Sequence, residues 1–263
     1  CVLAASTAHI AVDECGAPEF MTGSSLKTIP TPDGKLTPDH IRPWLSYIGV
    51  EHHSQPKVIY ISQCTEVGTV YTIEEIKALC DFAHKHQMYV HMDGARLANA
   101  AAALGKSLKE VSLDSGIDIL SFGGTKNGIM MGEAVITFRK ELAENMKYIR
   151  KQSAQLCAKM RYISAQFIAY MENDLWLQNA RHANRMAQYL RNEMAAIHPF
   201  TFTQATDANI LLLKLPQTVI EQLLQKHFFY IWNEAEGEIR LVTSWDTTEE
   251  DIKSFIEYLH KLI

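Results

Sequence analysis

The chain has 263 residues, of which 47% are hydrophobic and 21% charged, which is typical of a folded protein and excludes extensive disorder. Its formal net charge of −5 gives no indication of a nucleic-acid partner. No apolar run reaches the roughly eighteen residues that a membrane span needs. The five cysteines are scattered and form no CxxC pair, which favours structural thiols in a reducing compartment over a disulfide framework or a zinc site. We therefore expect a cytoplasmic protein.

The apolar stretch at the start of the chain, Cys1 to Ala5, has two interpretations. We expect a buried strand cut from a longer polypeptide, because the stretch runs directly into residues with active-site character. The alternative is a lipid-modified N-terminal cysteine, which would more often lead into a polar linker.

Strands and helices alternate between residues 57 and 138. Short apolar, β-branched runs predict strands, and apolar side chains at helical spacing predict helices. Thr72 and Glu75 form a capping-box pattern at the start of the first helix, and Gly105 ends the second. The strands are expected at 58–61, 88–92, 117–122 and 133–138, and the helices at 72–86 and 96–104. This alternation predicts an α/β fold with a mainly parallel sheet.

The pattern changes in the second half of the chain. Residues 142–194 are helical in pattern and contain no proline. Beyond them we expect strands at 208–215 and 238–243, a helix at 218–226, and a final amphipathic helix that begins near Thr247. We therefore predict a large α/β domain at residues 1–172 and a small C-terminal α+β domain at residues 173–263.

Two residues with catalytic potential follow neighbouring strands. Asp93 comes just past one predicted strand and Lys126 just past the next, so both are expected where ligands bind in open α/β sheets. An acid and a lysine in one crevice suit pyridoxal phosphate, because the lysine forms a Schiff base and the acid keeps the pyridine nitrogen protonated. Spacing alone leaves open a surface lysine in a glycine-rich loop and an aspartate that caps a helix.

Several motifs resemble the low-specificity threonine aldolases, which belong to the β-eliminating lyase branch of the fold type I pyridoxal phosphate enzymes. The resemblance covers essentially the whole chain, with the motifs in the right order. They are His91-Met-Asp-Gly-Ala-Arg-Leu-Ala-Asn-Ala100, Ser121-Phe-Gly-Gly-Thr-Lys-Asn-Gly128, Gly132-Glu-Ala-Val135, Ala8 to Glu19, Gln63 to Tyr71, and Arg240-Leu-Val-Thr-Ser-Trp245.

This resemblance implies an aspartate aminotransferase-like large domain and pyridoxal 5'-phosphate as cofactor. It implies that Lys126 holds the cofactor, Asp93 binds its pyridine nitrogen, and His9 stacks on the ring and takes part in proton transfer. Arg96 is expected at the cofactor's phenolic oxygen or at the substrate carboxylate. Arg240 is expected to bind the substrate carboxylate, for which a planar, bidentate guanidinium is well suited.

The implied reaction is cleavage of threonine or allo-threonine to glycine and an aldehyde. The resemblance also implies a homo-oligomer, a tetramer or a dimer. Other amino-acid lyases and aminotransferases of the same fold share these residues, so they remain an alternative. We expect no metal, because the histidine pairs His52-His53 and His84-x-His86 have no carboxylate or cysteine at ligand spacing.

The sequence departs from the family pattern in two places. Many relatives have a histidine in a Glu-Asn-Thr-His motif where this chain reads Ser62-Gln-Cys-Thr-Glu66, so the base for the substrate hydroxyl is open. Family members also begin some seventy residues earlier, and that segment includes a phosphate-binding loop. A non-catalytic fragment therefore remains a second alternative.

Overall fold

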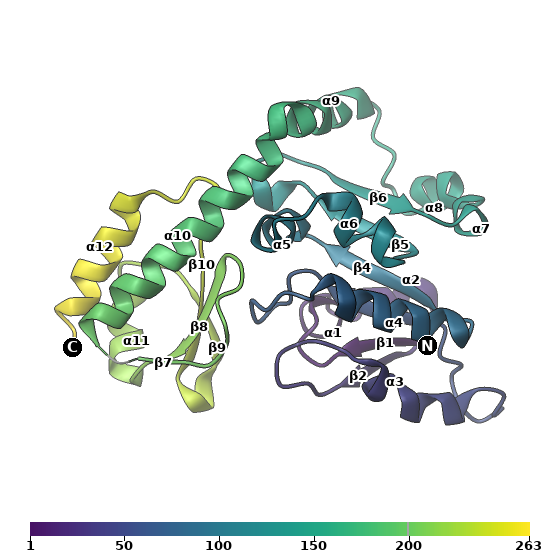
Figure 1. The fold of residues 1–263 in the computed structure, drawn as a ribbon, viewed down its shortest axis with the longest axis horizontal. Coiled ribbons are helices and arrows are strands. Elements are labelled where there is room, and N and C mark those ends of the chain that lie inside the picture. The colour runs from purple at the N-terminus through teal and green to yellow at the C-terminus, as the bar shows by residue number, and fades with distance from the viewer. Residues whose placement is uncertain (199) are drawn as a thin grey trace.

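The computed structural model describes residues 1–198 and 200–263, which form two sheets with separate apolar cores (Figure 1). Sheet A has the strand order β2-β1-β3-β4-β5-β6. Its first five strands pair in parallel, and only β6 runs antiparallel, against β5. The strands are β1 (Val2–Ala5), β2 (Leu26–Ile29), β3 (Val58–Ser62), β4 (Tyr89–Gly94), β5 (Ile119–Gly123) and β6 (Glu133–Thr137). The predicted α/β fold with a mainly parallel sheet is confirmed.

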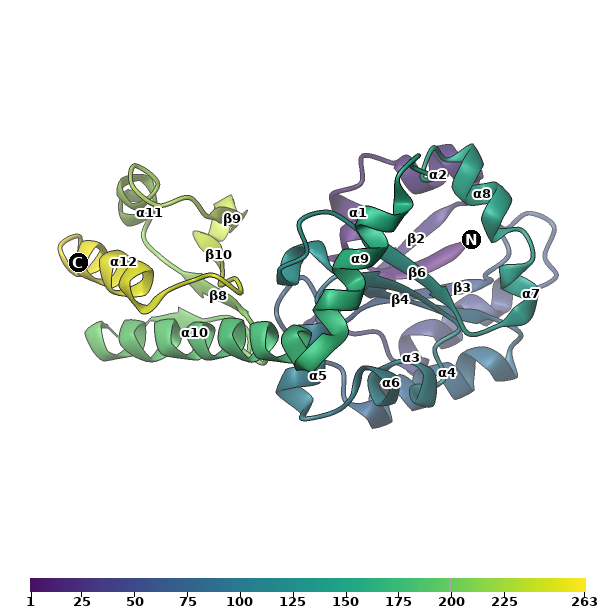
Figure 2. The ribbon, with the colours of Figure 1, turned by 90° about the horizontal axis from the view of Figure 1, so that it is seen from above.

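Helices cover both faces of sheet A (Figure 2). One face carries α3 (Pro38–Ile41), α4 (Ile73–Lys85), α5 (Leu97–Leu104) and α6 (Leu108–Val111). The other carries α1 (His9–Val12), α2 (Ala17–Thr22), α8 (Met146–Gln152) and α9 (Met160–Met171), and α7 (Lys140–Ala143) follows β6. Helix α4 begins as predicted, because the side chain of Thr72 accepts from the Glu75 amide and the Glu75 carboxylate accepts from the Thr72 amide.

Sheet B is small and entirely antiparallel, with the order β7-β8-β10-β9. Helix α10 crosses from the large sheet to this one and packs beside α12 (Figure 1). The elements are β7 (Thr201–Phe202), β8 (Ile210–Lys214), β9 (Tyr230–Asn233), β10 (Glu238–Val242), α10 (Leu175–Ile197), α11 (Gln217–Leu223) and α12 (Glu249–His260). This is the α+β arrangement predicted for the C-terminal part.

The helical stretch predicted over residues 142–194 is broken into separate helices. Between α9 and α10 lies the one-turn segment η4 (Glu172–Asp174), in which Asn173 and Asp174 have φ angles of 53° and 54°. Asn and Asp tolerate this left-handed conformation better than most residues, so they redirect the chain without a proline. The boundary predicted between residues 172 and 173 falls in this segment, and we retain it as our proposal.

Two asparagines join α10 to the large sheet's helix α5. Asn99 Nδ2 lies 3.1 Å from Asn184 Oδ1, and Asn184 Nδ2 donates to the Asn99 carbonyl at 2.9 Å. The side-chain NH2 group of each asparagine therefore has an acceptor on the other residue, so the buried Asn99 side chain is not left without a partner. The helix that carries sheet B is therefore fixed to the layer that carries the carboxyl end of β4.

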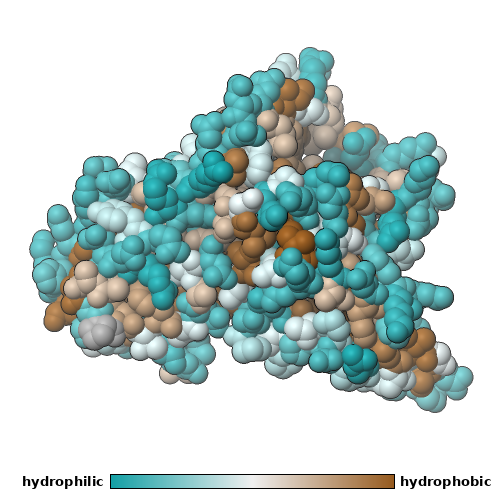
Figure 3. Space-filling model, viewed as in Figure 1, coloured by the Kyte–Doolittle hydropathy of each residue, from teal (hydrophilic) through white to brown (hydrophobic). Residues whose placement is uncertain are grey.

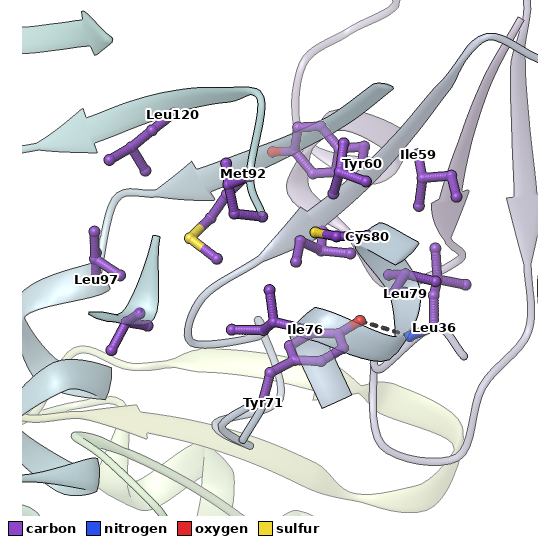
Figure 4. Close-up of a cluster of buried hydrophobic side chains, with 14 of the residues drawn as sticks. Leu36, Ile59, Tyr60, Tyr71, Ile76, Leu79, Cys80, Met92, Leu97 and Leu120 are labelled. Carbon is purple, nitrogen blue, oxygen red and sulfur yellow. Dashed lines mark hydrogen bonds between the residues drawn. The ribbon is translucent and has the colours of Figure 1, made fainter. Parts of the chain in front are cut away.

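Apolar side chains of α4 fill the space beneath β3 and β4 (Figure 4). Ile76 and Leu79 are fully buried there. Tyr71, only 1% exposed, lies in the same cluster, and its hydroxyl accepts a hydrogen bond from the Leu36 amide. This contact anchors the loop before α3 to the core.

The outer surface in the view of Figure 3 is largely hydrophilic, with apolar groups gathered near its centre and at its lower edges. No helix among residues 1–198 and 200–263 is both long and apolar enough to cross a membrane.

Replacing Tyr71 by Phe should lower the free energy of unfolding by about 1–3 kcal/mol, because the buried Leu36 amide would lose its acceptor. Urea denaturation of parent and variant measures this difference. The matched control is Tyr148→Phe on α8, where the side chain is exposed and a change within about 0.5 kcal/mol is expected. Equal effects of the two substitutions would contradict the role given to the Tyr71 hydroxyl.

Candidate active site

Asp93 and Lys126 lie at the same edge of sheet A. Asp93 is near the carboxyl end of β4, and Lys126 is in the one-turn segment η3 (Thr125–Asn127) directly after β5. The two strands are parallel neighbours, with Asp93 opposite Ser121. Their carboxyl ends therefore meet at one edge, which is where ligands bind in open α/β sheets.

The Asp93 carboxylate is held in one orientation by two donors. Its Oδ2 accepts from the Tyr60 hydroxyl at 2.6 Å, and its Oδ1 accepts from the Ala95 amide at 2.9 Å. Burial, and then the negative charge of Asp93, raise the pKa of Tyr60 far above its ordinary value, so the phenol stays protonated and continues to donate. Each carboxylate oxygen can accept a further hydrogen bond, so Asp93 can receive another donor.

His91, which is half-buried, lies on the same strand as Asp93. His91 and Asp93 are two residues apart on β4 and therefore face the same side of the sheet. His91 Nε2 lies 2.9 Å from Ser121 Oγ, and its ring stands edge-on to Tyr60 with a centroid distance of 5.2 Å. Burial lowers the pKa of His91, so the neutral ring adds no charge beside Asp93 at neutral pH.

Glu133 fixes the turn that carries Lys126. Its Oε2 accepts from the Gly124 amide and its Oε1 from the Thr125 amide, both at 3.2 Å. One carboxylate at the start of β6 thus binds two successive amides just before the lysine. The lysine's position depends on the antiparallel pairing of β6 with β5, in which Glu133 lies opposite Gly123.

The far side of the same turn is bound by the helices α9 and α10. Asn127 Nδ2 donates to the Tyr170 hydroxyl and to the Trp176 carbonyl, and Asn179 Nδ2 donates to the Asn127 carbonyl at 2.9 Å. Gly128 follows with a φ of 109°, and a Cβ there would lie 2.6 Å from Asn179 Nδ2. A side chain at Gly128 would therefore both strain the backbone and displace this clamp.

The Lys126 amine is less basic than an ordinary lysine. Its side chain reaches solvent, yet the surrounding protein atoms desolvate the amine and lower its pKa, and the positive charge of Arg96 lowers it further. Asp93 and Glu133 act in the opposite direction. A lysine with a lowered pKa has a larger neutral fraction near pH 7, and the neutral amine is the form that attacks a carbonyl carbon.

Arg240 reaches the site from sheet B. It lies in β10, is 8% exposed, and donates from Nε to the Glu66 carbonyl at 2.7 Å. Its guanidinium carbon is 5.6 Å from the ring centroid of Trp232, within the range of a cation–π contact. Burial, together with the charge of Arg96, lowers the pKa of Arg240 to about 10, so the guanidinium remains positive at neutral pH.

Arg96 follows the end of β4, and His9 follows the end of β1. Arg96 is the N-cap residue of α5, and its charge lowers the pKa of both Lys126 and Arg240, so these cations lie near one another. His9 begins α1, after β1. Its Nδ1 lies 2.7 Å from Glu14 Oε1, and its backbone amide donates to Glu66 Oε1 at 2.9 Å.

The donor set fits pyridoxal phosphate. Asp93 offers an oriented carboxylate with open acceptor positions for a pyridine nitrogen, and Lys126 offers an amine that forms no hydrogen bond within residues 1–198 and 200–263. Arg96 and Arg240 supply positive charge for acidic groups of cofactor and substrate.

The beta-eliminating lyase family model matches residues 1–216 of the chain. The chain belongs to this family. It is 41% identical over 253 residues to a low specificity L-threonine aldolase from Pseudomonas aeruginosa, which covers 96% of this chain and 73% of that protein. Among solved structures, a Leishmania major threonine aldolase superimposes with a TM-score of 0.92 and 34% identity, covering 99% of this chain and 77% of that one.

A Thermus thermophilus aspartate aminotransferase shares the fold at 18% identity, with a TM-score of 0.72 over the whole of this chain and 69% of that one. The fold type I architecture expected from the motifs is confirmed, and membership of the family makes pyridoxal phosphate the cofactor of this β-eliminating lyase.

The sequence did not identify three residues that shape the site. Tyr60 is two positions before the end of β3, and only the strand register brings it to Asp93. Glu133 was recognised as part of a motif, but its contacts with the Lys126 turn depend on the β5–β6 pairing. Glu66 belongs to the Gln63 to Tyr71 motif, but the sequence assigns it no role, because its burial is a tertiary property.

The pH at which half of the Lys126 amine is reactive should be shifted in opposite directions by two substitutions. Removing the Arg96 charge in Arg96→Gln should raise the Lys126 pKa and move its reaction midpoint to higher pH. Removing the Glu133 charge in Glu133→Gln should move the midpoint to lower pH. Reductive methylation with formaldehyde at a series of pH values, followed by peptide mass spectrometry, measures the midpoint. Exposed Lys140 is the internal reference, and shifts of the same sign in both variants would contradict the assignment.

Proposed function

We propose that this β-eliminating lyase cleaves threonine or allo-threonine to glycine and acetaldehyde with pyridoxal phosphate. The observation that carries the proposal is that Lys126 and Asp93 follow neighbouring parallel strands at one edge of sheet A, and that Arg240 of sheet B is bound to the loop after β3 at the same edge. The relatives from Pseudomonas aeruginosa and Leishmania major are both named threonine aldolases, which supports this choice of reaction.

Four side chains would hold the cofactor. Lys126 would bind its aldehyde carbon, Asp93 its pyridine nitrogen, and Arg96 its phenolic oxygen, while His9 would lie against the ring. When bound, pyridoxal phosphate supplies an electron-deficient ring that accepts the electron pair of the broken Cα–Cβ bond. Tyr60 contributes by fixing Asp93, which must remain an ionised acceptor for the nitrogen to stay protonated.

Arg240 would hold the substrate by its α-carboxylate. Its Nε is already bound to the Glu66 carbonyl, and this bond fixes the plane of the guanidinium. Its two terminal nitrogens form no hydrogen bond within the described residues, so they can bind a carboxylate in the bidentate manner. A fixed carboxylate in turn fixes the direction in which the β-carbon leaves.

We further propose that the chain forms a homo-oligomer, a tetramer or a dimer. Large apolar side chains are exposed on one side of sheet A, among them Phe20 at 87% and Met130 at 90%, with Ile149 and Ile168. Helices α2, α8 and α9 carry most of them and lie on the same side of sheet A in Figure 2. Large apolar side chains exposed on one side of a protein are typical of a surface covered by another subunit.

The cytoplasm is the compartment we propose. All five cysteines are free, and Cys64 and Cys80 are buried. A reducing environment would keep them as thiols.

Incubation of the complete protein with pyridoxal phosphate and threonine or allo-threonine should release glycine and acetaldehyde in equal amounts. Coupled reduction of acetaldehyde by alcohol dehydrogenase measures the rate. Turnover of a different amino acid without acetaldehyde would instead assign the chain to a sister lyase or an aminotransferase. Absence of turnover with every amino acid, despite a folded protein, would favour the non-catalytic alternative.

Lys126 and Asp93 should differ in what their loss removes. Borohydride reduction of the loaded protein should attach the cofactor to the Lys126 peptide in the parent and in Asp93→Asn, and leave Lys126→Ala without this modification. Asp93→Asn should nevertheless lose on the order of 10²–10³ in rate, because an amide stabilises a protonated pyridine nitrogen poorly. A labelled site in Lys126→Ala, or parent turnover in Asp93→Asn, would refute these roles.

A further inference from the structure

A second carboxylate, Glu66, lies beside the site without an assigned role. It is 7% exposed and sits in the loop after β3. Its Oε1 accepts from the Ser62 hydroxyl at 2.7 Å and from the His9 amide at 2.9 Å. The carboxylate is therefore fixed to the carboxyl end of β3 and to the start of α1, two of the elements that frame the site.

Only one oxygen of Glu66 is used by these contacts. Within residues 1–198 and 200–263, Oε2 accepts no hydrogen bond from another residue. This oxygen is also not fully enclosed by protein atoms. A fixed carboxylate with one open, accessible oxygen can receive a proton from a bound molecule without rearranging.

Burial makes this carboxyl group more basic than an ordinary glutamate. Desolvation raises the pKa of Glu66, and the charge of Asp93 raises it further, although the hydrogen bonds from Ser62 and His9 act in the opposite direction. A glutamate with a raised pKa is a better proton acceptor near neutral pH than a solvated one.

Arg240 brings the substrate to Glu66. The Nε of Arg240 donates to the backbone carbonyl of Glu66 itself, so the two residues are in direct contact. An α-amino acid whose carboxylate is held by the terminal nitrogens of Arg240 has its β-substituent within a few bonds of that point. The Glu66 carboxylate is hydrogen-bonded to Ser62, which lies opposite Asp93 in the strand register, so the carboxylate and Arg240 both border the site.

We propose that Glu66 is the general base that takes the proton from the β-hydroxyl of the substrate. This inference rests on the proposed threonine cleavage. The Glu66 carboxylate accepts the hydroxyl proton, the O–H electron pair becomes the second bond of the aldehyde, and the Cα–Cβ bond breaks with its pair remaining on the Cα side. A proton then returns to Cα, so threonine is converted to glycine and acetaldehyde with no other reactant.

Glu66 ends the stretch Ser62-Gln-Cys-Thr-Glu66, in which the sequence has no histidine to act as the base. The other candidate base on this side is His9, whose Nδ1 is paired with Glu14. The family resemblance implies that this ring stacks on the cofactor and takes part in proton transfer, so a variant has to distinguish His9 from Glu66. His9→Asn therefore distinguishes the two bases, because it should weaken cofactor binding rather than abolish cleavage selectively.

The test compares two reactions of Glu66→Gln in the complete, pyridoxal phosphate-loaded protein. Gln keeps an oxygen that accepts from Ser62 and His9 but cannot take a proton. Acetaldehyde release from threonine should fall about 10²–10⁴-fold. Exchange of the α-proton of glycine in deuterated water, followed by NMR, should stay at the parent rate because glycine has no β-hydroxyl. Glu257→Gln, at an exposed position on α12, is the matched control and should change neither reaction.

A second variant tests the role of Glu66 without requiring that the folded protein accept Gln at this position. Glu66→Ala removes the carboxylate and leaves space for a small one, so added formate should restore part of the acetaldehyde release. Equal losses in both reactions, or no response to formate while glycine exchange persists, would overturn the assignment of Glu66. A parent protein that exchanges glycine but releases no acetaldehyde would overturn the proposed function, and the base assignment with it.

Discussion

The parallel pairing of β3, β4 and β5 is the constraint on which the site depends. In this register Ser62, Asp93 and Ser121 lie side by side at the carboxyl ends of the three strands. A shift of one residue in β4 would turn Asp93 to the opposite face and bring Met92 in its place. The hydrophobic face of β4, formed by Val90 and Met92, opposes such a shift because both side chains are fully buried. The apolar core therefore fixes the position of the acid.

Positive and negative side chains lie close together at this edge of sheet A. Three cations, Arg96, Lys126 and Arg240, lie near one another, and burial, followed by the charge of Arg96, lowers the pKa of Lys126 and of Arg240. Such an arrangement is unfavourable for the protein alone and favourable once anionic groups of a ligand enter. Repulsion among like charges that a ligand would neutralise is typical of a binding site.

The small sheet contributes to the same site through two separate contacts. Arg240 of β10 donates to the loop after β3, and Asn179 of α10 donates to the turn that carries Lys126. A movement of α10 would therefore alter the lysine and the arginine together. Since the Asn99–Asn184 pair fixes α10 to α5, all of these groups are positioned by one connected scaffold.

The sequence by itself determined the alternation of strands and helices between residues 57 and 138, the capping of α4 by Thr72, and the placement of Asp93 and Lys126 after successive strands. These features are local, since hydrophobic periodicity and capping depend on residues a few positions apart. The break between α9 and α10 was not predicted, because Asn173 and Asp174 are compatible with both a helix and a left-handed turn. Likewise, the partners of Asp93 and Lys126, namely Tyr60 and Glu133, are 33 and 7 residues away in the chain. Only strand pairing in the folded sheet decides such contacts, because register and burial arise from the whole core and from no single segment.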